Sequence, residues 1–201
     1  MRIIAGSGKG KKLGSPTGDG VRPTSDRARE GLFSSLESEF NSIADLRFLD
    51  LFAGSGAVGV EALSRGAELV HAVEADAATV EIAISNFKLL SEPSRKHKVF
   101  HSRAARFLES DFPVKYDIIF MDPPYDLSNT EVEDLLDTIV VRDLLQPKGL
   151  IAIERDSKSS KSSKSSKSKE FTWPDALRLE KVRSYGQGSI YYGGYSDTVS
   201  E

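Results

Sequence analysis

The residues best suited to ligand chemistry form a glycine-rich segment, Asp50-Leu-Phe-Ala-Gly-Ser-Gly-Ala-Val-Gly59, between an apolar run and a helical pattern. Glycines let backbone N–H groups approach a ligand closely, because a Cβ atom there would collide with it. Gly54, Gly56 and Gly59 match the G-x-G-x-x-G pattern of dinucleotide-binding folds. Glu74 follows Gly54 by twenty residues, a spacing at which an acid binds a ribose hydroxyl. The segment predicts a nucleotide site, with a ligand-free strand–helix turn as the alternative.

Two features favour S-adenosylmethionine over a nicotinamide cofactor. Asp50 stands at the end of the predicted strand, where a carboxylate suits a cationic ammonium group better than a pyrophosphate. The first strand also comes only after a long prelude rather than near the start of the chain. We therefore expect Asp50 near the amino group, the Gly54–Gly56 backbone near the methionine and ribose, and Glu74 on the ribose diol. For Gly59, helix packing is the expected role.

A second motif, Asp122-Pro-Pro-Tyr125, follows another apolar run and suits the binding of a nucleobase amine. Two prolines end strand pairing and fix the following backbone. The Asp122 carboxylate and the Pro123 carbonyl can accept the two N–H groups of an exocyclic amine, and Tyr125 can stack on the base. Catalysis by such a site comes from positioning and electrostatics, without a strong general base. A strand-ending turn with a packed tyrosine is the alternative for the isolated motif.

Positive charge is unevenly distributed, although the formal net charge is only −3. Residues 1–30 carry a net +4 and residues 157–169 a net +5, so the other residues carry −12. Polyanion binders need local rather than global positive charge. On charge alone, however, a solvated surface arm is the simpler interpretation.

Alternating strand and helix patterns must position these motifs. The expected strands are the apolar runs at 47–52, 69–74, 116–121 and 149–153, a weaker one near 98–102, and a closing pair at 177–185 and 189–195. Helical patterns occupy 57–65, 76–90, 103–110 and 129–145, and an earlier helix begins near Asp26 with the stripe Ala28, Leu32, Leu36 and Phe40. Such alternation predicts a parallel sheet with helices on both faces.

Composition limits the possible classes of protein. The 201 residues can bury one sizeable core, and the absence of Cys excludes disulfide scaffolds, cysteine zinc sites and cysteine nucleophiles. No apolar run approaches the roughly 20 residues of a membrane span, and no signal peptide is evident. We therefore expect a cytoplasmic protein. The Ser/Lys repeat at 157–169 has no apolar residue, so a disordered surface loop is expected there.

Over nearly its whole length, the chain resembles the RsmD family of bacterial 16S rRNA guanine-N2 methyltransferases. The resemblance lies in Met1-Arg-Ile-Ile-Ala-Gly6, Arg22-Pro-Thr24, the glycine-rich segment, Asp122-Pro-Pro-Tyr125 and Tyr185-Gly186. The N-terminal residues are the part specific to the RsmD family, because DNA adenine methyltransferases share the glycine-rich segment and Asp122-Pro-Pro-Tyr125. The resemblance implies a Rossmann-like class I S-adenosylmethionine-dependent fold. That fold has a seven-stranded, mostly parallel sheet with a C-terminal antiparallel hairpin and helices on both faces.

The resemblance also implies roles for individual residues. The cofactor residues would be Asp50, Phe52, Gly54, Ser55, Gly56, Glu74, Arg103 and Ala104. The guanine would be held by Asp122, Pro123, Pro124 and Tyr125, and 16S rRNA, in the small subunit or an assembly intermediate, would meet Lys9, Lys11, Lys12, Arg22, Thr24 and Arg29. No metal is expected.

Two departures from the family pattern stand out. Arg103 replaces the usual Asp or Asn beside the adenine, so either a backbone amide near Ala104 reads the adenine or Arg103 packs on it. The Ser/Lys repeat at 157–169 is foreign to the family.

We expect a basic extension at 1–40, a methyltransferase domain at 41–201 and a monomer. A DNA adenine-N6 methyltransferase is the alternative function, and a nicotinamide-dependent oxidoreductase and a non-catalytic assembly factor are less favoured.

Overall fold

The computed structural model forms two compact units, Met1–Phe107 and Leu108–Glu201. The residues it describes are 1–16, 26–90, 96–111, 114–124, 126–156, 171–185 and 188–196. The sequence-based domain boundary after residue 40 falls inside the first unit and stays a prediction. Within the described ranges, no helix combines the length and apolar character that a membrane crossing requires.

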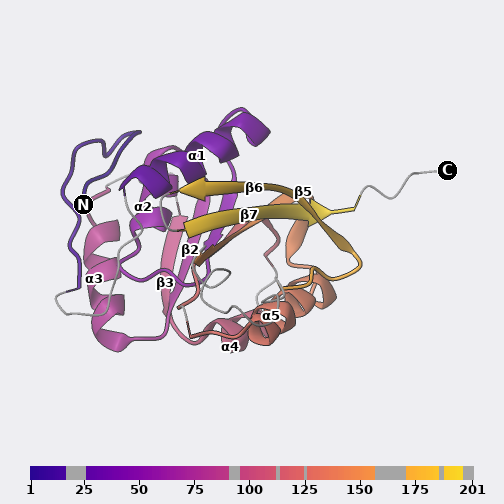
Figure 1. Cartoon of the computed structure of the whole chain (residues 1–201). Coiled ribbons are helices and arrows are strands. Elements are labelled where there is room, and N and C mark those ends of the chain that lie inside the picture. Colours follow the sequence, from indigo (N-terminus) through magenta and orange to yellow (C-terminus); the bar gives the residue numbers. More distant parts are fainter. Residues whose placement is uncertain are drawn as a thin grey trace, which may run out of the picture. The chain divides into compact units, whose positions relative to one another are not determined.

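The first unit contains three parallel strands in the order β3-β2-β1, of which β2 and β3 are labelled in Figure 1. These are β1 (Arg47–Asp50), β2 (Leu69–Glu74) and β3 (Lys96–His101). The interior of β2 is fully buried, whereas most of β3 is exposed because it is the outer strand of the three. This exposure explains why β3 has the weakest apolar pattern in the sequence.

Helices cover both faces of these strands. They are α1 (Asp26–Phe40), α2 (Ala57–Ser64), α3 (Ala77–Phe87) and α4 (Ala104–Leu108). Phe33 of α1 stacks on Phe48 of β1, and Phe107 of α4 meets the edge of Phe100 in β3. Phe48 pairs with Val70 and Phe100 with Val73. Because Val70 and Val73 are an odd number of residues apart, the two aromatic contacts lie on opposite faces.

Local signals in the sequence place two of these helices. Asp76 caps α3 by accepting a hydrogen bond from the Thr79 N–H at 2.8 Å. Three members of the predicted stripe on α1, Ala28, Leu32 and Leu36, are buried, whereas Phe40 is only half-buried. The predictions from apolar periodicity are therefore confirmed for the helix interiors, whereas the observed helix ends differ from the predicted ends by a few residues.

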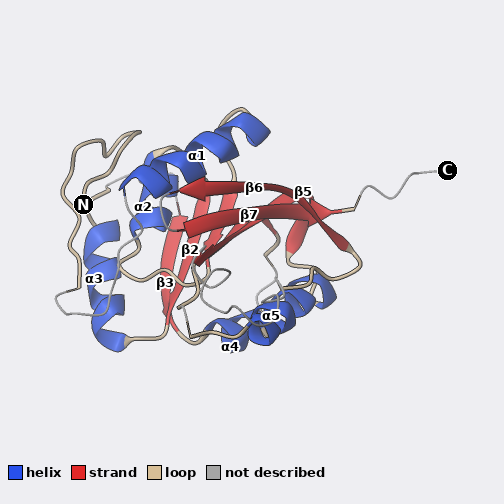
Figure 2. Cartoon of the chain, in the orientation of Figure 1, coloured by secondary structure: helices blue, strands red, loops and turns tan. Residues whose placement is uncertain are grey.

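The second unit has the strand order β4-β5-β7-β6. Its elements are β4 (Tyr116–Met121), α5 (Asn129–Val141), β5 (Leu145–Asp156), β6 (Leu177–Tyr185) and β7 (Gly188–Tyr195), coloured by type in Figure 2. β4 and β5 are parallel, whereas β7 is antiparallel to both β5 and β6. The expected C-terminal antiparallel hairpin is thus confirmed. The Ser/Lys repeat at 157–169 lies outside the described residues.

The boundary between α5 and β5 differs from the sequence-based one. The helix predicted to reach residue 145 ends at Val141, and Asp143 turns the chain with a φ of 52°. β5 then begins at Leu145 and includes Pro147, which was expected to stop the helix. The proline is tolerated because the register of β4 and β5 shifts where it lies, between the pairs Tyr116–Leu145 and Ile118–Leu150.

His71 gives the first unit a pH-dependent stability. His71 is 5% exposed, and its ring forms a T-shaped contact with the Phe100 ring, with the two ring centroids 5.1 Å apart. Burial, followed by the charge of Lys98, lowers the His71 pKa from 6.5 to about 4. The unfolded chain therefore takes up this proton first as pH falls from 6.5 to 4, and the folded state loses relative stability across that window.

We expect His71 to contribute a loss of about 3 kcal/mol in unfolding free energy between pH 7 and pH 4, at about 1.4 kcal/mol per pKa unit. Urea denaturation of the wild type and of His71→Gln measures this contribution as the difference between their pH profiles. Parallel profiles for the two proteins would contradict the assignment.

Candidate functional site

The glycine-rich segment leads from Asp50, the last residue of β1, into the start of α2. Asp50 is 1% exposed, and its Oδ2 accepts a hydrogen bond from the Gly59 N–H at 3.0 Å. This bond joins the end of β1 to the first turn of α2 and holds the carboxylate in place. A Cβ at Gly59 would lie 2.9 Å from the Phe87 ring and 3.1 Å from Val70. Gly59 therefore has the packing role expected from the sequence.

Gly54 and Gly56 give the segment a backbone that other residues rarely adopt. Their φ angles are 51° and 76°, both in the left-handed region. Gly56 caps α2, and a Cβ there would lie within 3.4 Å of Phe87 and Ala83. At Gly54, by contrast, a Cβ would meet no atom of the described residues within 4 Å. The loop is therefore packed against the protein at Gly56 and open at Gly54, which leaves room for a ligand to approach its backbone.

Glu74 and the glycine loop are brought together as the sequence predicts. The Glu74 Oε2 accepts a hydrogen bond from the Gly54 N–H at 2.9 Å, and Oε1 accepts one from the Asp76 N–H at 2.8 Å. The Ala53 N–H also donates to the Val73 carbonyl at 2.9 Å. These bonds fix a half-buried carboxylate at the carboxyl end of β2, beside the open part of the loop.

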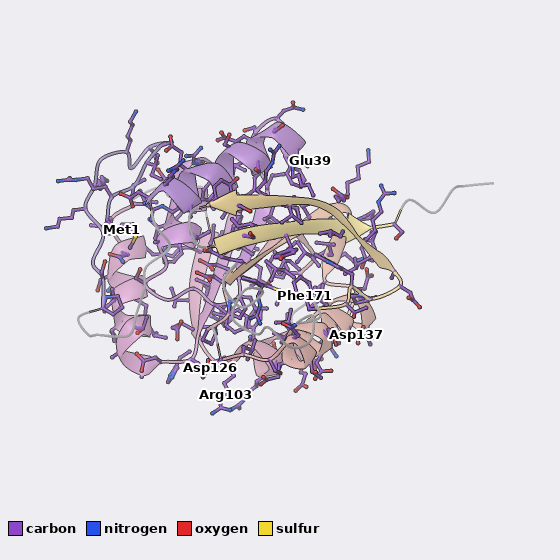
Figure 3. All side chains as sticks on the ribbon, in the orientation of Figure 1. Met1, Glu39, Arg103, Asp126, Asp137 and Phe171 are labelled. Atoms are coloured by element: carbon purple, nitrogen blue, oxygen red, sulfur yellow. The ribbon has the colours of Figure 1, made fainter. Side chains whose placement is uncertain are left out.

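The remaining predicted cofactor residues differ in their exposure. The Ser102 N–H donates to the Glu74 carbonyl at 2.9 Å, so the segment leading into α4 lies against the end of β2. Arg103 is exposed and projects away from the ribbon (Figure 3), whereas Ala104 is buried. Phe52 is half-buried and Ser55 is buried in the glycine loop. The two alternatives for reading the adenine therefore stay predictions.

Asp122 and the two prolines follow the carboxyl end of β4 in the second unit. Asp122 is half-buried, Pro123 is buried and Pro124 is exposed. The Leu127 N–H donates to the Pro124 carbonyl at 3.0 Å, which closes a tight turn after the prolines. Ser128 then caps α5 in a capping box with Glu131. Tyr125 lies outside the described residues, so its stacking role stays a prediction.

Arg155 supports this turn and was missed by the sequence analysis. Its guanidinium donates to the Leu127 carbonyl and to Asn129 Oδ1, both at 3.0 Å. Burial lowers the pKa of Arg155 from its ordinary value. The contact ties β5 to the loop that follows Asp122-Pro-Pro. Nothing in the local sequence signals it, because the partners are 26 and 28 residues away.

The N-terminal basic residues have different environments. Lys9, Lys11 and Lys12 are exposed, as an RNA contact requires, whereas Arg22 and Thr24 lie outside the described residues. Arg29 is fully buried, and its guanidinium donates to the Arg2 carbonyl and to Asp26. This burial contradicts a direct RNA contact for Arg29. The side chain instead anchors the first residues of the chain on α1.

Comparison with known proteins agrees with this fold and these motifs. The family model described as "Conserved hypothetical protein 95" matches residues 1–193. Ribosomal RNA small subunit methyltransferase D of Escherichia coli strain K12 is 36% identical over 156 residues, which are 78% of this chain and 75% of that protein. The Haemophilus influenzae protein of the same name is 34% identical over 157 residues, covering 78% of this chain and 79% of that protein.

Solved structures show the same fold. An Escherichia coli structure described as a methyltransferase candidate, yhhF, has a TM-score of 0.77 and 32% identity, and covers 97% of both chains. A more distant methyltransferase candidate, SMU.776, complexed with SAH, has a TM-score of 0.65 and 16% identity. The similarity covers 87% of this chain and 51% of the SMU.776 chain, and at this low identity it supports a shared fold only. The chain has a Rossmann-like class I methyltransferase fold and belongs to the conserved hypothetical protein 95 family, the RsmD family that its sequence resembles.

Proposed function

We propose that this protein transfers a methyl group from S-adenosylmethionine to the N2 amine of a guanine in 16S rRNA. The observation that carries the cofactor assignment is the bond between the Glu74 carboxylate and the Gly54 N–H, beside a loop that is open to a ligand. The substrate class is supported by the curated relatives, which are named for methylation of small-subunit ribosomal RNA.

The residues of the first unit fit the cofactor by their chemistry. Glu74 offers carboxylate oxygens to a ribose diol, and the Asp50 carboxylate at the end of β1 suits an ammonium group. Phe52, Ser55, Gly56, Arg103 and Ala104 would complete the site. When bound, S-adenosylmethionine supplies an activated methyl group on a sulfonium.

In the second unit, Asp122 and the Pro123 carbonyl would accept the two N–H groups of the guanine amine. This amine is a poor nucleophile because its lone pair is delocalised into the ring. Holding both N–H groups draws the nitrogen toward tetrahedral geometry and frees the lone pair for in-line attack. The turn held by Arg155 would keep the acceptors in place, with Pro124 and Tyr125 bordering the base.

RNA would be met by the exposed Lys9, Lys11 and Lys12, together with Arg22 and Thr24. A guanine in structured RNA must leave its stack to reach a pocket of this kind. Arg29 would act only by holding the first residues of the chain. We further propose that the protein works as a monomer in the cytoplasm, on 16S rRNA or on an assembly intermediate of the small subunit.

Two measurements test this function. Calorimetry should give micromolar-range binding of S-adenosylhomocysteine and no binding of NADH, and the reverse would indicate an oxidoreductase. Nucleoside mass spectrometry of small-subunit rRNA, after incubation with the protein and S-adenosylmethionine, should show N2-methylguanosine. Appearance of N6-methyladenine in DNA, with unmodified rRNA, would instead support the alternative substrate.

A further inference from the structure

The side-chain amide of Asn86 joins the N-terminal segment, residues 1–16, to the glycine loop. Asn86 lies near the end of α3 and is 3% exposed. Its Nδ2 donates to the Gly14 carbonyl at 3.0 Å and to the Ser55 carbonyl at 2.8 Å, and its Oδ1 accepts from the Gly14 N–H at 2.8 Å. Both amide protons are therefore used, one on each partner segment.

The Ser55 carbonyl belongs to the peptide bond that sets the shape of the loop. On one side of this bond, Asn86 holds the Ser55 oxygen, and on the other the Gly56 N–H donates to the Ala53 carbonyl at 2.7 Å. The orientation of this peptide determines how the backbone around Gly54 and Gly56 is presented. The Asn86 amide is therefore bonded directly to a peptide of the glycine loop.

Gly14 is where the same amide holds the N-terminal segment. Gly14 stands two residues after Lys12, one of the exposed basic residues proposed to meet RNA. A two-point contact between one side-chain amide and both backbone groups of Gly14 fixes the direction of the chain as well as its position. The segment is thereby oriented by the residue that holds the loop.

From this arrangement we infer that Asn86 is a positioning residue that couples cofactor binding to the order of the basic N-terminal segment, and through it to RNA binding. The inference rests on the proposed function for the identity of the two ligands. Coupling of this kind is reciprocal and usually changes affinity by about 5- to 150-fold. We expect S-adenosylhomocysteine to tighten binding of a 16S rRNA fragment by about tenfold, within that range.

The test variant is Asn86→Asp, and Ser64→Ala is its control. Asn86→Asp keeps the side-chain shape but places an acceptor opposite the carbonyls of Gly14 and Ser55. Ser64 also anchors the segment, since it accepts from the Gly8 N–H at 2.9 Å and donates to the Ala5 carbonyl at 2.6 Å. Neither of these partners belongs to the glycine loop, so Ser64→Ala weakens the attachment of the segment without breaking its link to the loop.

Hydrogen exchange with saturating S-adenosylhomocysteine tests the coupling without RNA. Exchange in residues 8–16 should slow several-fold in the wild type and in Ser64→Ala, and should not respond in Asn86→Asp. With RNA added, the expected tightening should fall to within about twofold in Asn86→Asp, well below the usual range of coupling.

The wild-type experiment alone can overturn the inference, even if Asn86→Asp fails to fold. Binding of S-adenosylhomocysteine that protects the glycine loop but leaves exchange in residues 8–16 unchanged would exclude the coupling, while the methyltransferase assignment would stand. If exchange in residues 8–16 slowed equally in Asn86→Asp, Asn86 would be excluded as the residue that transmits the coupling. Failure of S-adenosylhomocysteine to bind in calorimetry would remove the proposed function and the inference together.

Discussion

Replacement of Asp122 with alanine should lower methyl-transfer turnover by about 10²- to 10³-fold, the usual effect of removing one preorganised group that stabilises charge in the transition state. Asp122 follows the end of β4 and is proposed to accept an N–H of the guanine amine, which becomes cationic as the methyl group arrives. The cofactor residues of the first unit are unchanged, so affinity for S-adenosylhomocysteine should stay within about twofold of the wild type. Single-turnover rates and calorimetry measure the two quantities separately.

Asp126→Ala is the matched control for this substitution. Asp126 is an exposed carboxylate in the same loop, four residues after Asp122 (Figure 3). Its removal changes the net charge by the same amount and should leave turnover near that of the wild type. Turnover that is unchanged in Asp122→Ala, or that falls equally in both variants, would refute a specific role for Asp122.

Replacement of Glu61 with alanine should lower the unfolding free energy by about 3–5 kcal/mol, as expected when one partner of a buried ionic group is removed. Glu61 is fully buried on α2, where its carboxylate accepts from the backbone N–H groups of Ile4 and Ala5 at 2.8 and 2.9 Å. It also pairs with Arg65 at 2.9 Å and lies 3.9 Å from the buried Arg29. Alanine would leave these cationic and N–H groups without their acceptor.

Glu37→Ala provides the comparison in urea denaturation. Glu37 binds the same Arg65 at 2.7 Å, but its side chain is 41% exposed. The Arg65 side chain is only 10% exposed, but it keeps its bond to Glu61 when Glu37 is removed. The loss in Glu37→Ala should therefore stay near that of an ordinary surface ion pair, about 0–1 kcal/mol. Similar losses of unfolding free energy in the two variants would show that burial of Glu61 does not control its contribution.

The sequence predicts most of the fold because its signals are local. The buried interiors of β2 and β4 appear as continuous apolar runs, and Asp76 marks the start of α3 as a helix cap. The contact between Glu74 and Gly54 is also foreseeable, because parallel strands bring their carboxyl ends to one edge of the sheet. The outer strand β3 has a weak pattern, since its side chains are largely exposed.

Contacts between distant residues were not predictable in the same way. Asn86 is one polar residue in an amphipathic helix, and its partners Gly14 and Ser55 lie 72 and 31 residues away. Arg29 stands among other basic residues, and only the packing around it shows that it is buried beside Glu61. The end of α5 was placed too late because Pro147 is accommodated by a local shift in strand register.

The attachment of residues 1–16 has a consequence for the surface that we propose meets RNA. Three side chains hold this segment by hydrogen bonds to its backbone N–H groups, which every amino acid except proline has. The side chains are those of Glu61, Ser64 and Asn86, and the N–H groups are those of Ile4, Ala5, Gly8 and Gly14. Outward-facing positions such as Lys9 and Lys12 can therefore be exchanged while the anchor persists. The side chains proposed to contact RNA can thus change, by selection or by design, without loss of the hydrogen bonds that hold the segment.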